Sequence, residues 1–179
     1  LPLRLARARH SDSFPTDRPV VLGGQPWTDG TVIDADPAAR ALGVRRGIPL
    51  GSAHRLAPEA AFLDPEPEAD AASVEAAFEV LARFSPGLAG VTDQADPAFG
   101  LLEVQVDGLE RLWGSEPQTV GRLVAALAGV LPGQPRPGIA GTRFAATVAA
   151  GNATPSEPRI VRPDGEADFL APLPASLLS

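Results

Sequence analysis

Short apolar runs separated by turn residues dominate the first part of the chain and predict short strands and helices. The β-branched run 20–22 ends at two glycines and indicates a buried strand, and 31–33 is expected to be the next strand. Asp36 can cap a short helix over 37–42, and a second short helix is expected over 50–56.

Longer periodic patterns follow in the second part. Val74, Phe78 and Leu81 recur at helical spacing, whereas apolar and polar residues alternate over 102–107, as in a strand with one buried face. Together with a strand expected over 88–91, the alternating segment predicts a hairpin with a long loop. The remaining expected helices and strands lie over 115–131, 138–140, 142–150 and 160–161.

This mixture of helices and strands predicts an α+β domain with α/β layers. The 179 residues suit one domain, or one domain with a small appended lobe, and 44% hydrophobic residues can supply a core. No apolar run reaches the roughly 18 residues that a membrane span needs. We therefore expect a cytoplasmic protein that does not enter a membrane.

The composition limits which kinds of functional site the chain can form. Cysteine is absent, and the only two histidines, His10 and His54, lie far apart without nearby carboxylates in the sequence, so no metal site is predicted. All basic residues are arginine, and the formal net charge is −7. Because affinity for nucleic acid depends largely on basic groups that neutralise phosphates, we expect this chain alone to bind DNA weakly if at all.

Few local motifs carry chemistry. Phosphate-binding loops, the dinucleotide-binding glycine motif and the serine-hydrolase elbow are all absent. Asp34 and Asp36 have a spacing that can hold a divalent cation, but Asp36 is already expected to cap a helix. The acidic run 64–70 is interpreted as a solvated linker, and Trp113 as an aromatic residue of the core or of a domain edge.

Four segments, taken in order, carry a resemblance. Residues 33–49 (IDADPAARALGVRRGIP) are similar to an A-R-x-x-G-V-x-x-G-M-P motif, and 84–86 with 107–114 to a hairpin followed by T-G-x-x-x-L-F-G. Residues 138–146 are similar to G-I-A-x-T-K-x-x-A, and 169–174 to F-L-x-P-L-P. In this order the motifs resemble the Y-family (translesion) DNA polymerases, the DinB and UmuC relatives. Within that superfamily the chain resembles most the ImuB-type accessory proteins of bacterial mutagenesis cassettes.

The resemblance implies a Y-family-like palm, a ferredoxin-like mixed sheet with helices on one face, together with small helical fingers. In the domain layout that it implies, residues 1–30 are the N-terminal part of the palm, without its first strand, and residues 31–64 are the fingers. Residues 65–171 are the rest of the palm, and residues 172–179 are the start of a linker that leaves it.

The resemblance also implies where metal-binding carboxylates should lie. Polymerase palms hold two metal ions with one Asp from the first strand, which would precede Leu1, and an Asp-Glu pair from the hairpin. Counting back from Gly108, the pair falls at Gly100 and Leu101, and a further strand Asp falls at Gln105. None of these residues binds metal as a carboxylate does.

A second gap placement puts Asp93 and Gln94 on the pair, with 95–100 as an inserted turn. The second acid is then an amide, which cannot bridge two cations. Both placements predict a broken metal site and hence a protein that is not an enzyme.

The triphosphate contacts are partly kept. By resemblance, Arg40 occupies the place of a fingers arginine that grips phosphate, and Arg143 that of a palm lysine, whereas the accompanying fingers tyrosine is Pro37 here. Two interpretations stay open: a vestigial nucleotide site, or two surface arginines that only form salt bridges, which we favour.

We therefore predict a non-catalytic Y-family-like accessory or scaffold protein, without a cofactor, in DNA repair and translesion (mutagenic) DNA synthesis. The resemblance implies three partners: a DNA repair polymerase, a RecA-like accessory protein and the sliding clamp. One alternative is an active translesion polymerase fragment in which Mg²⁺ is bound by misaligned acids among Asp34, Asp36, Asp93 and Asp96. The other is a purely protein-binding domain with a vestigial polymerase fold.

Overall fold

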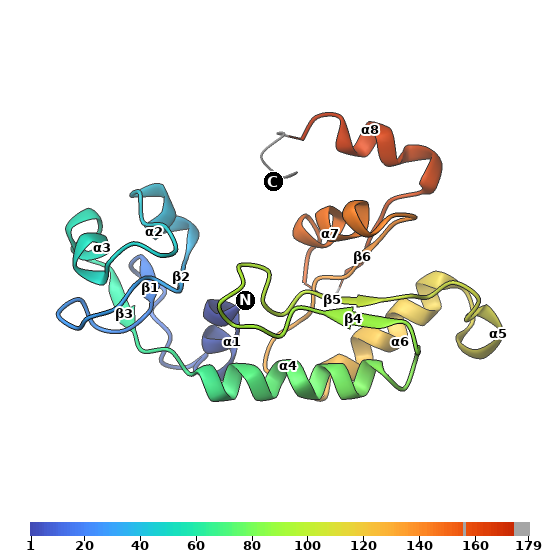
Figure 1. Ribbon diagram of the computed structural model, residues 1–179, viewed down its shortest axis with the longest axis horizontal. Helices are drawn as coiled ribbons and strands as arrows, with labels where there is room; N and C mark the ends of the chain where they lie inside the picture. Colours follow the sequence, from blue (N-terminus) through green and yellow to red (C-terminus); the bar gives the residue numbers. More distant parts are fainter. Residues whose placement is uncertain (156, 174–179) are drawn as a thin grey trace. The chain divides into compact units, whose positions relative to one another are not determined.

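A computed structural model describes residues 1–155 and 157–173, and the chain forms two compact units (Figure 1). The first unit comprises Leu1–Val74 and Thr92–Gly100, and the second comprises Glu75–Val91 and the described residues from Leu101 onward. Helix α4 (Pro67–Leu81) begins in the first unit and ends in the second.

The first unit is built on a three-stranded sheet of order β2-β1-β3. Strand β1 (Val20–Leu22) is antiparallel to β2 (Asp34–Ala35) and parallel to β3 (Ala61–Leu63). All three side chains of β1 are at most 1% exposed. A continuous apolar run is typical of a strand covered on both faces, and the predicted buried strand is confirmed.

Helices cover both faces of this sheet because side chains alternate along β1. Val21 packs in one core cluster with α2 (Pro37–Ala41) and α3 (Leu50–Leu56), whereas Val20 and Leu22 pack with Leu3 of α1 on the other face. Helix α1 spans Pro2–Arg9. The predicted cap of α2 is confirmed, since the Asp36 side chain accepts a hydrogen bond from Ala39 N at 2.7 Å.

The second unit contains a hairpin and a two-stranded parallel ladder. Strand β4 (Leu88–Gly90) is antiparallel to β5 (Leu102–Val104), and β6 (Gly138–Ile139) is parallel to β7 (Arg159–Ile160). The hairpin packs on α4 and on α6, through a cluster that includes Ala77, Leu81, Leu88, Leu102, Val104, Leu123 and Leu127. The other helical segments are α5 (Glu110–Trp113), α6 (Glu116–Ala128), α7 (Arg143–Gly151), the 3-10 turn Pro163–Gly165 and α8 (Glu166–Leu170).

Two expectations about the first unit are corrected. The strand expected over 31–33 is displaced to β2, because Ile33 N donates to Leu22 O whereas Val32 N donates to Ile48 O, so the backbone changes partners within that segment. The strand β3 was not expected at all.

The acidic run 64–70 is not a solvated linker. Helix α4 begins inside it at Pro67, and Asp70 is only 3% exposed, because its carboxylate pairs with an arginine of α1. A run of acidic residues can therefore include a buried helical residue when a cation far away in the sequence meets it.

The mixed α+β class is confirmed, with the strands in three small sheets among the described residues. The expected linker over 172–179 and the motif over 169–174 both extend past residue 173. Their residues from 174 onward lie outside the described residues.

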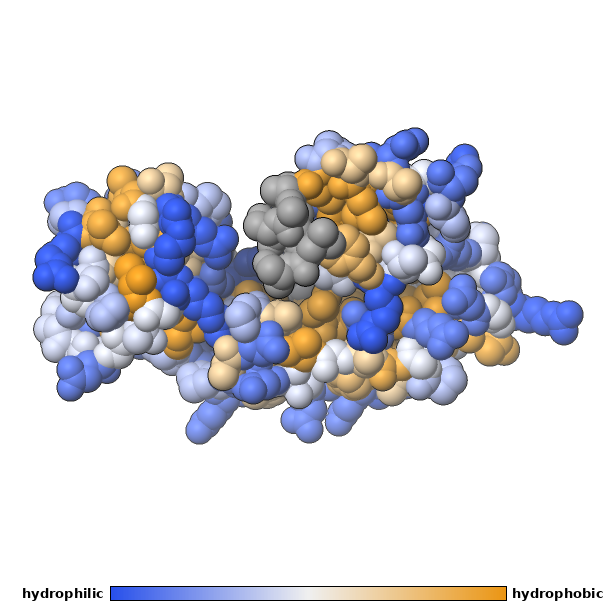
Figure 2. Space-filling view, turned by 45° about the horizontal axis from the view of Figure 1, so that its top comes forward, coloured by the Kyte–Doolittle hydropathy of each residue, from blue (hydrophilic) through white to orange (hydrophobic). Residues whose placement is uncertain are grey.

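Within the described ranges, no helix is long and apolar enough to cross a membrane. Apolar and hydrophilic residues are interspersed on the face shown in Figure 2. Isolated apolar side chains on a surface are normal. The large exposed ones are Trp27, Leu42, Leu56, Leu112, Phe144 and Ile160.

Candidate functional site

Arg40, in the last turn of α2, is paired with an acid from the strand that precedes its helix. Its Nη2 lies 2.7 Å from Asp34 Oδ1, and the same oxygen accepts a hydrogen bond from Ala35 N at 2.9 Å. The second oxygen, Oδ2, accepts from Leu3 N at 3.3 Å and lies 3.6 Å from the amino group of Leu1. Asp34 therefore joins β2, α2 and the start of α1.

Arg143, the first residue of α7, is paired in a similar way in the second unit. Its Nη2 contacts the Glu103 carboxylate of β5. Sequence reasoning did not select Glu103, although the polar positions of the alternating segment 102–107 were a signal for it. Each arginine at a motif position is thus held by a carboxylate on a strand of its own unit.

The start of α7 is held by a further carboxylate. Glu166, the first residue of α8, accepts hydrogen bonds from Gly141 N at 2.5 Å, from Thr142 N at 3.1 Å and from Thr142 Oγ1 at 2.9 Å. Thr142 Oγ1 in turn accepts from Ala145 N at 3.3 Å and caps the helix. These contacts fix the backbone on which Arg143 is mounted.

The three positions that counting assigned to metal ligands have backbone roles. Gly100 has φ +80°, a backbone conformation that favours glycine, and a Cβ there would lie 1.9 Å from Leu1 Cδ2, so the Leu1 side chain would have to move. Leu101 O accepts a hydrogen bond from Val91 N at 2.9 Å next to the hairpin ladder. Gln105 O accepts from Ser85 Oγ at 2.7 Å.

The acids of the hairpin loop are engaged in turns. Asp93 Oδ1 accepts from Ala95 N at 2.9 Å, and Asp96 Oδ1 accepts from Ala98 N at 2.7 Å. Side-chain bonds to the backbone two residues further on are typical of Asx turns. Arg46 Nη2 donates to two carbonyl groups of the same loop, each at 3.0 Å, and attaches it to the connector between α2 and α3.

The described residues do not form a metal-binding cluster. Asp34 is engaged by Arg40, Asp36 caps α2, and Asp93 and Asp96 close turns. No group of three or more His, Asp or Glu side chains is placed to hold a metal ion in the described part of the chain.

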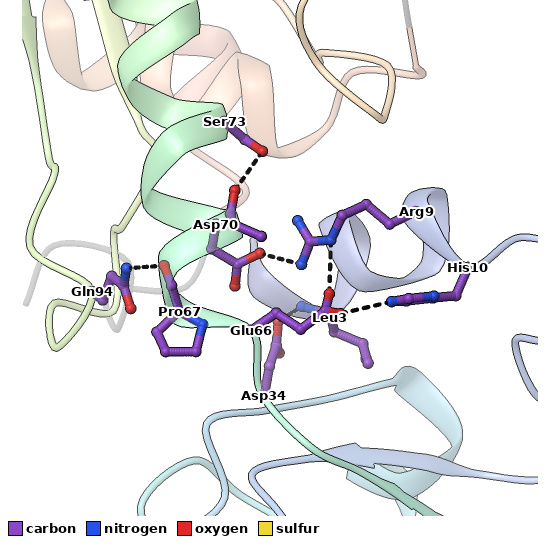
Figure 3. Close-up of polar contacts among 10 residues, drawn as sticks. Leu3, Arg9, His10, Asp34, Glu66, Pro67, Asp70, Ser73 and Gln94 are labelled. Carbon is purple, nitrogen blue, oxygen red and sulfur yellow. Dashed lines mark hydrogen bonds and ion pairs between the residues drawn. The ribbon is translucent and has the colours of Figure 1, made fainter.

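A separate ion-pair cluster joins α1 to the start of α4 (Figure 3). Arg9 Nε lies 2.8 Å from Glu66 Oε2, and Arg9 Nη2 lies 2.7 Å from Asp70 Oδ1. His10 Nε2 lies 2.9 Å from Glu66 Oε1, so the expectation that His10 lacks a carboxylate partner was wrong. Hydrogen bonds from His10 and then from Arg9 hold the pKa of Glu66 below its usual range. We interpret this cluster as structural.

The class of protein follows from the fold. The chain has the fold of solved Y-family DNA polymerases. It is similar to DinB from Sulfolobus solfataricus, with a TM-score of 0.67 and 19% identity over 93% of this chain and 47% of that one. A Y-family DNA polymerase chimera, Dbh-Dpo4(243-245)-Dbh, gives a TM-score of 0.68 and 18% identity over 96% of this chain and 49% of that one.

The family follows from the sequence. Residues 5–151 match the impB/mucB/samB family, and the chain belongs to that family. A "DNA polymerase IV" of Dehalococcoides mccartyi (strain BAV1) is 32% identical over 90% of this chain and 40% of its own length. A "DNA polymerase IV 2" of Mesorhizobium japonicum is 32% identical over 90% of this chain and 36% of its own length. The chain thus spans about 40% of the length of these relatives, and the resemblance to the Y family is confirmed.

The prediction that the chain is not an enzyme is wrong. It depended on missing acids, yet relatives named DNA polymerase IV match 90% of this chain. The deduction placed the acid pair by counting along the chain, and its two counts fell on different residues, Gly100 and Leu101 or Asp93 and Gln94. It also applied a ligand inventory for a whole polymerase to a chain of 40% of the relatives' length.

Proposed function

We propose that this chain is the palm-and-fingers portion of a translesion DNA polymerase and that it binds the incoming deoxynucleoside triphosphate. Support comes from the family match and from relatives that carry the name DNA polymerase IV. The observation that carries the proposal is the position of two surface guanidinium groups. Arg40 and Arg143 are 58% and 80% exposed, and both occupy motif positions at which the Y-family resemblance expects phosphate contacts.

Guanidinium groups suit this role. Their planar fork donates parallel hydrogen bonds to phosphate oxygens and keeps its charge at every working pH. Arg40 and Arg143 are each mounted on a helix that begins at a side-chain cap, so their backbones are well fixed while their heads reach solvent. We assign to these two arginines the binding and orientation of the nucleotide phosphates.

The proposal extends to the longer protein. We place it in the cytoplasm, acting on DNA during repair, with the sliding clamp as a partner. The narrower predictions, an ImuB-type accessory role with a second polymerase and a RecA-like protein, stay predictions from the sequence. So does the domain layout.

Primer extension by the full-length protein that contains this chain tests the proposal, on an intact template and on one with a lesion. Losing a hydrogen bond to a charged group costs about 2 kcal/mol, so Arg40→Ala is expected to raise the KM for the nucleotide by at least about tenfold. The matched control is Arg18→Ala, which removes another exposed arginine of the first unit that is paired with an aspartate. The proposal is refuted by the absence of extension at saturating nucleotide, or by equal KM values for the two variants.

A further inference from the structure

Each of the two arginines proposed to contact phosphate is already paired with an acid of its own unit. Arg40 Nη2 lies 2.7 Å from Asp34 Oδ1, and Arg143 Nη2 contacts Glu103 Oε2. A phosphate that binds either guanidinium must therefore compete with a carboxylate for the same donors. The inference below rests on the proposed function of these two arginines.

Within each pair the acid is the more buried member and the arginine is the more exposed one. Asp34 is 14% exposed against 58% for Arg40, and Glu103 is 25% exposed against 80% for Arg143. Asp34 is also held by the backbone N–H groups of Ala35 and Leu3. The Arg40 head can consequently turn toward a ligand while the Asp34 carboxylate stays in place.

We propose that Asp34 and Glu103 are internal competitors of the nucleotide phosphates, each for the arginine of its own unit, and that each lowers the affinity of that arginine for phosphate. While the carboxylates are in contact with the guanidinium groups, they neutralise the charge that would attract a phosphate. When a nucleotide displaces them, they remain close to its phosphates and repel them. Both effects weaken binding, and both disappear when the carboxylate becomes an amide.

The size of the effect follows from elementary electrostatics. The interaction between two unit charges about 4 Å apart in water changes a binding constant by roughly a factor of five, and a triphosphate carries several charges. An exposed ion pair adds up to about the same factor. Asp34→Asn is therefore expected to tighten nucleotide binding by about tenfold, and Glu103→Gln, whose acid is more exposed, by about fivefold.

Isothermal titration of inorganic tripolyphosphate, and of dATP with Mg²⁺, into the full-length protein tests the inference. The matched control is Asp17→Asn, which opens the exposed pair with Arg18 in the first unit and is expected to change neither affinity. High salt should reduce the gain of Asp34→Asn because it screens the repulsion. Unchanged or weaker binding in both Asp34→Asn and Glu103→Gln would overturn the inference, since weaker binding would mean that the acids orient the arginines for phosphate.

The second variant and the second assay separate the possible failures. If Asp34→Asn does not fold, as judged by circular dichroism, Glu103→Gln tests the same inference in the other unit. If the wild-type protein extends primers and neither variant gains affinity, the inference fails and the proposed function stands. If no protein extends primers but tripolyphosphate binds more tightly to the variants, the proposed function fails and the competition is real.

Discussion

The ion pair between α1 and α4 gives the sharpest stability prediction. Asp70 is 3% exposed in the first turn of α4, and its carboxylate lies 2.7 Å from Arg9 Nη2 at the end of α1 (Figure 3). Replacing it, as Asp70→Ala, leaves Arg9 with Glu66 alone. Arg9 Nη1 is buried and already has no hydrogen-bond partner, so the guanidinium cannot lose another acceptor without cost.

The magnitude follows from the surroundings of the pair. Breaking a fully buried ion pair costs about 3–5 kcal/mol because the remaining charge stays buried. Here the cost is smaller, since the Arg9 side chain is 18% exposed and keeps its 2.8 Å contact with Glu66. Burial raises the pKa of the Asp70 carboxyl above its usual value and the Arg9 contact opposes this only in part, so the desolvation of Asp70 lowers the net value of the pair further. We expect about 2 kcal/mol, close to the value of one hydrogen bond to a charged group.

Hydrogen exchange of the α1 amides measures this change directly. A loss of about 2 kcal/mol should accelerate their exchange by roughly 30-fold, provided that the equilibrium between closed and open states determines the exchange rate. The control is Asp17→Ala, which removes a pair whose side chains are both more than half exposed and should leave the exchange of the α1 amides nearly unchanged. Exchange in Asp70→Ala that is no faster than in this control would refute the reasoning. Slower exchange would mean that the desolvation of the pair outweighs its attraction.

Two further predictions concern pH and close packing. A carboxyl with a lowered pKa stabilises the folded state above its unfolded pKa, and this stability disappears as the pH falls through the folded pKa. Because hydrogen bonds from His10 and then Arg9 lower the pKa of Glu66, the difference in Tm between the wild type and Glu66→Gln should be present at pH 7. It should begin to shrink below about pH 4.5 and close below the lowered folded pKa; a difference that persists at pH 2 would contradict this. Gly138→Ala should destabilise the protein by about 3 kcal/mol in urea unfolding, because the new Cβ would lie 2.2 Å from Ala146 O, a backbone atom that cannot turn aside. The control Gly121→Ala, in a helix with open space around it, should stabilise by about 0.5–1 kcal/mol, and the same sign for both glycines would refute the packing argument.

Local signals explain what the sequence predicted well. The Asp36 cap followed by Pro37 specified the start of α2, and the capping box of Ser115 with Gln118 is present at the start of α6. In each case the interacting atoms lie within a few residues of one another, so the sequence contains both partners side by side.

Long-range pairs explain what the sequence did not predict. Arg9 and Asp70 are 61 residues apart, and no periodicity in the acidic run 64–70 reveals that one of its carboxylates meets a buried guanidinium. Glu103 was invisible as a partner of Arg143 for the same reason. Hydrophobic patterns indicate which face of an element is buried, but they do not say which charged side chains meet there.

The mistaken prediction about catalysis has a related origin. Assigning a lost ligand by counting needs a single register, and the two counts disagreed: one stayed within 100–108, whereas the other crossed the Asx turns of the loop between β4 and β5. Arginines are better markers here, because Arg40 and Arg143 each follow a capped helix start within their own motif and need no count across a loop. Both arginines are held by strand acids that came from no motif. The chemistry of this site is therefore better tested through the competition between carboxylate and phosphate than through an inventory of absent acids.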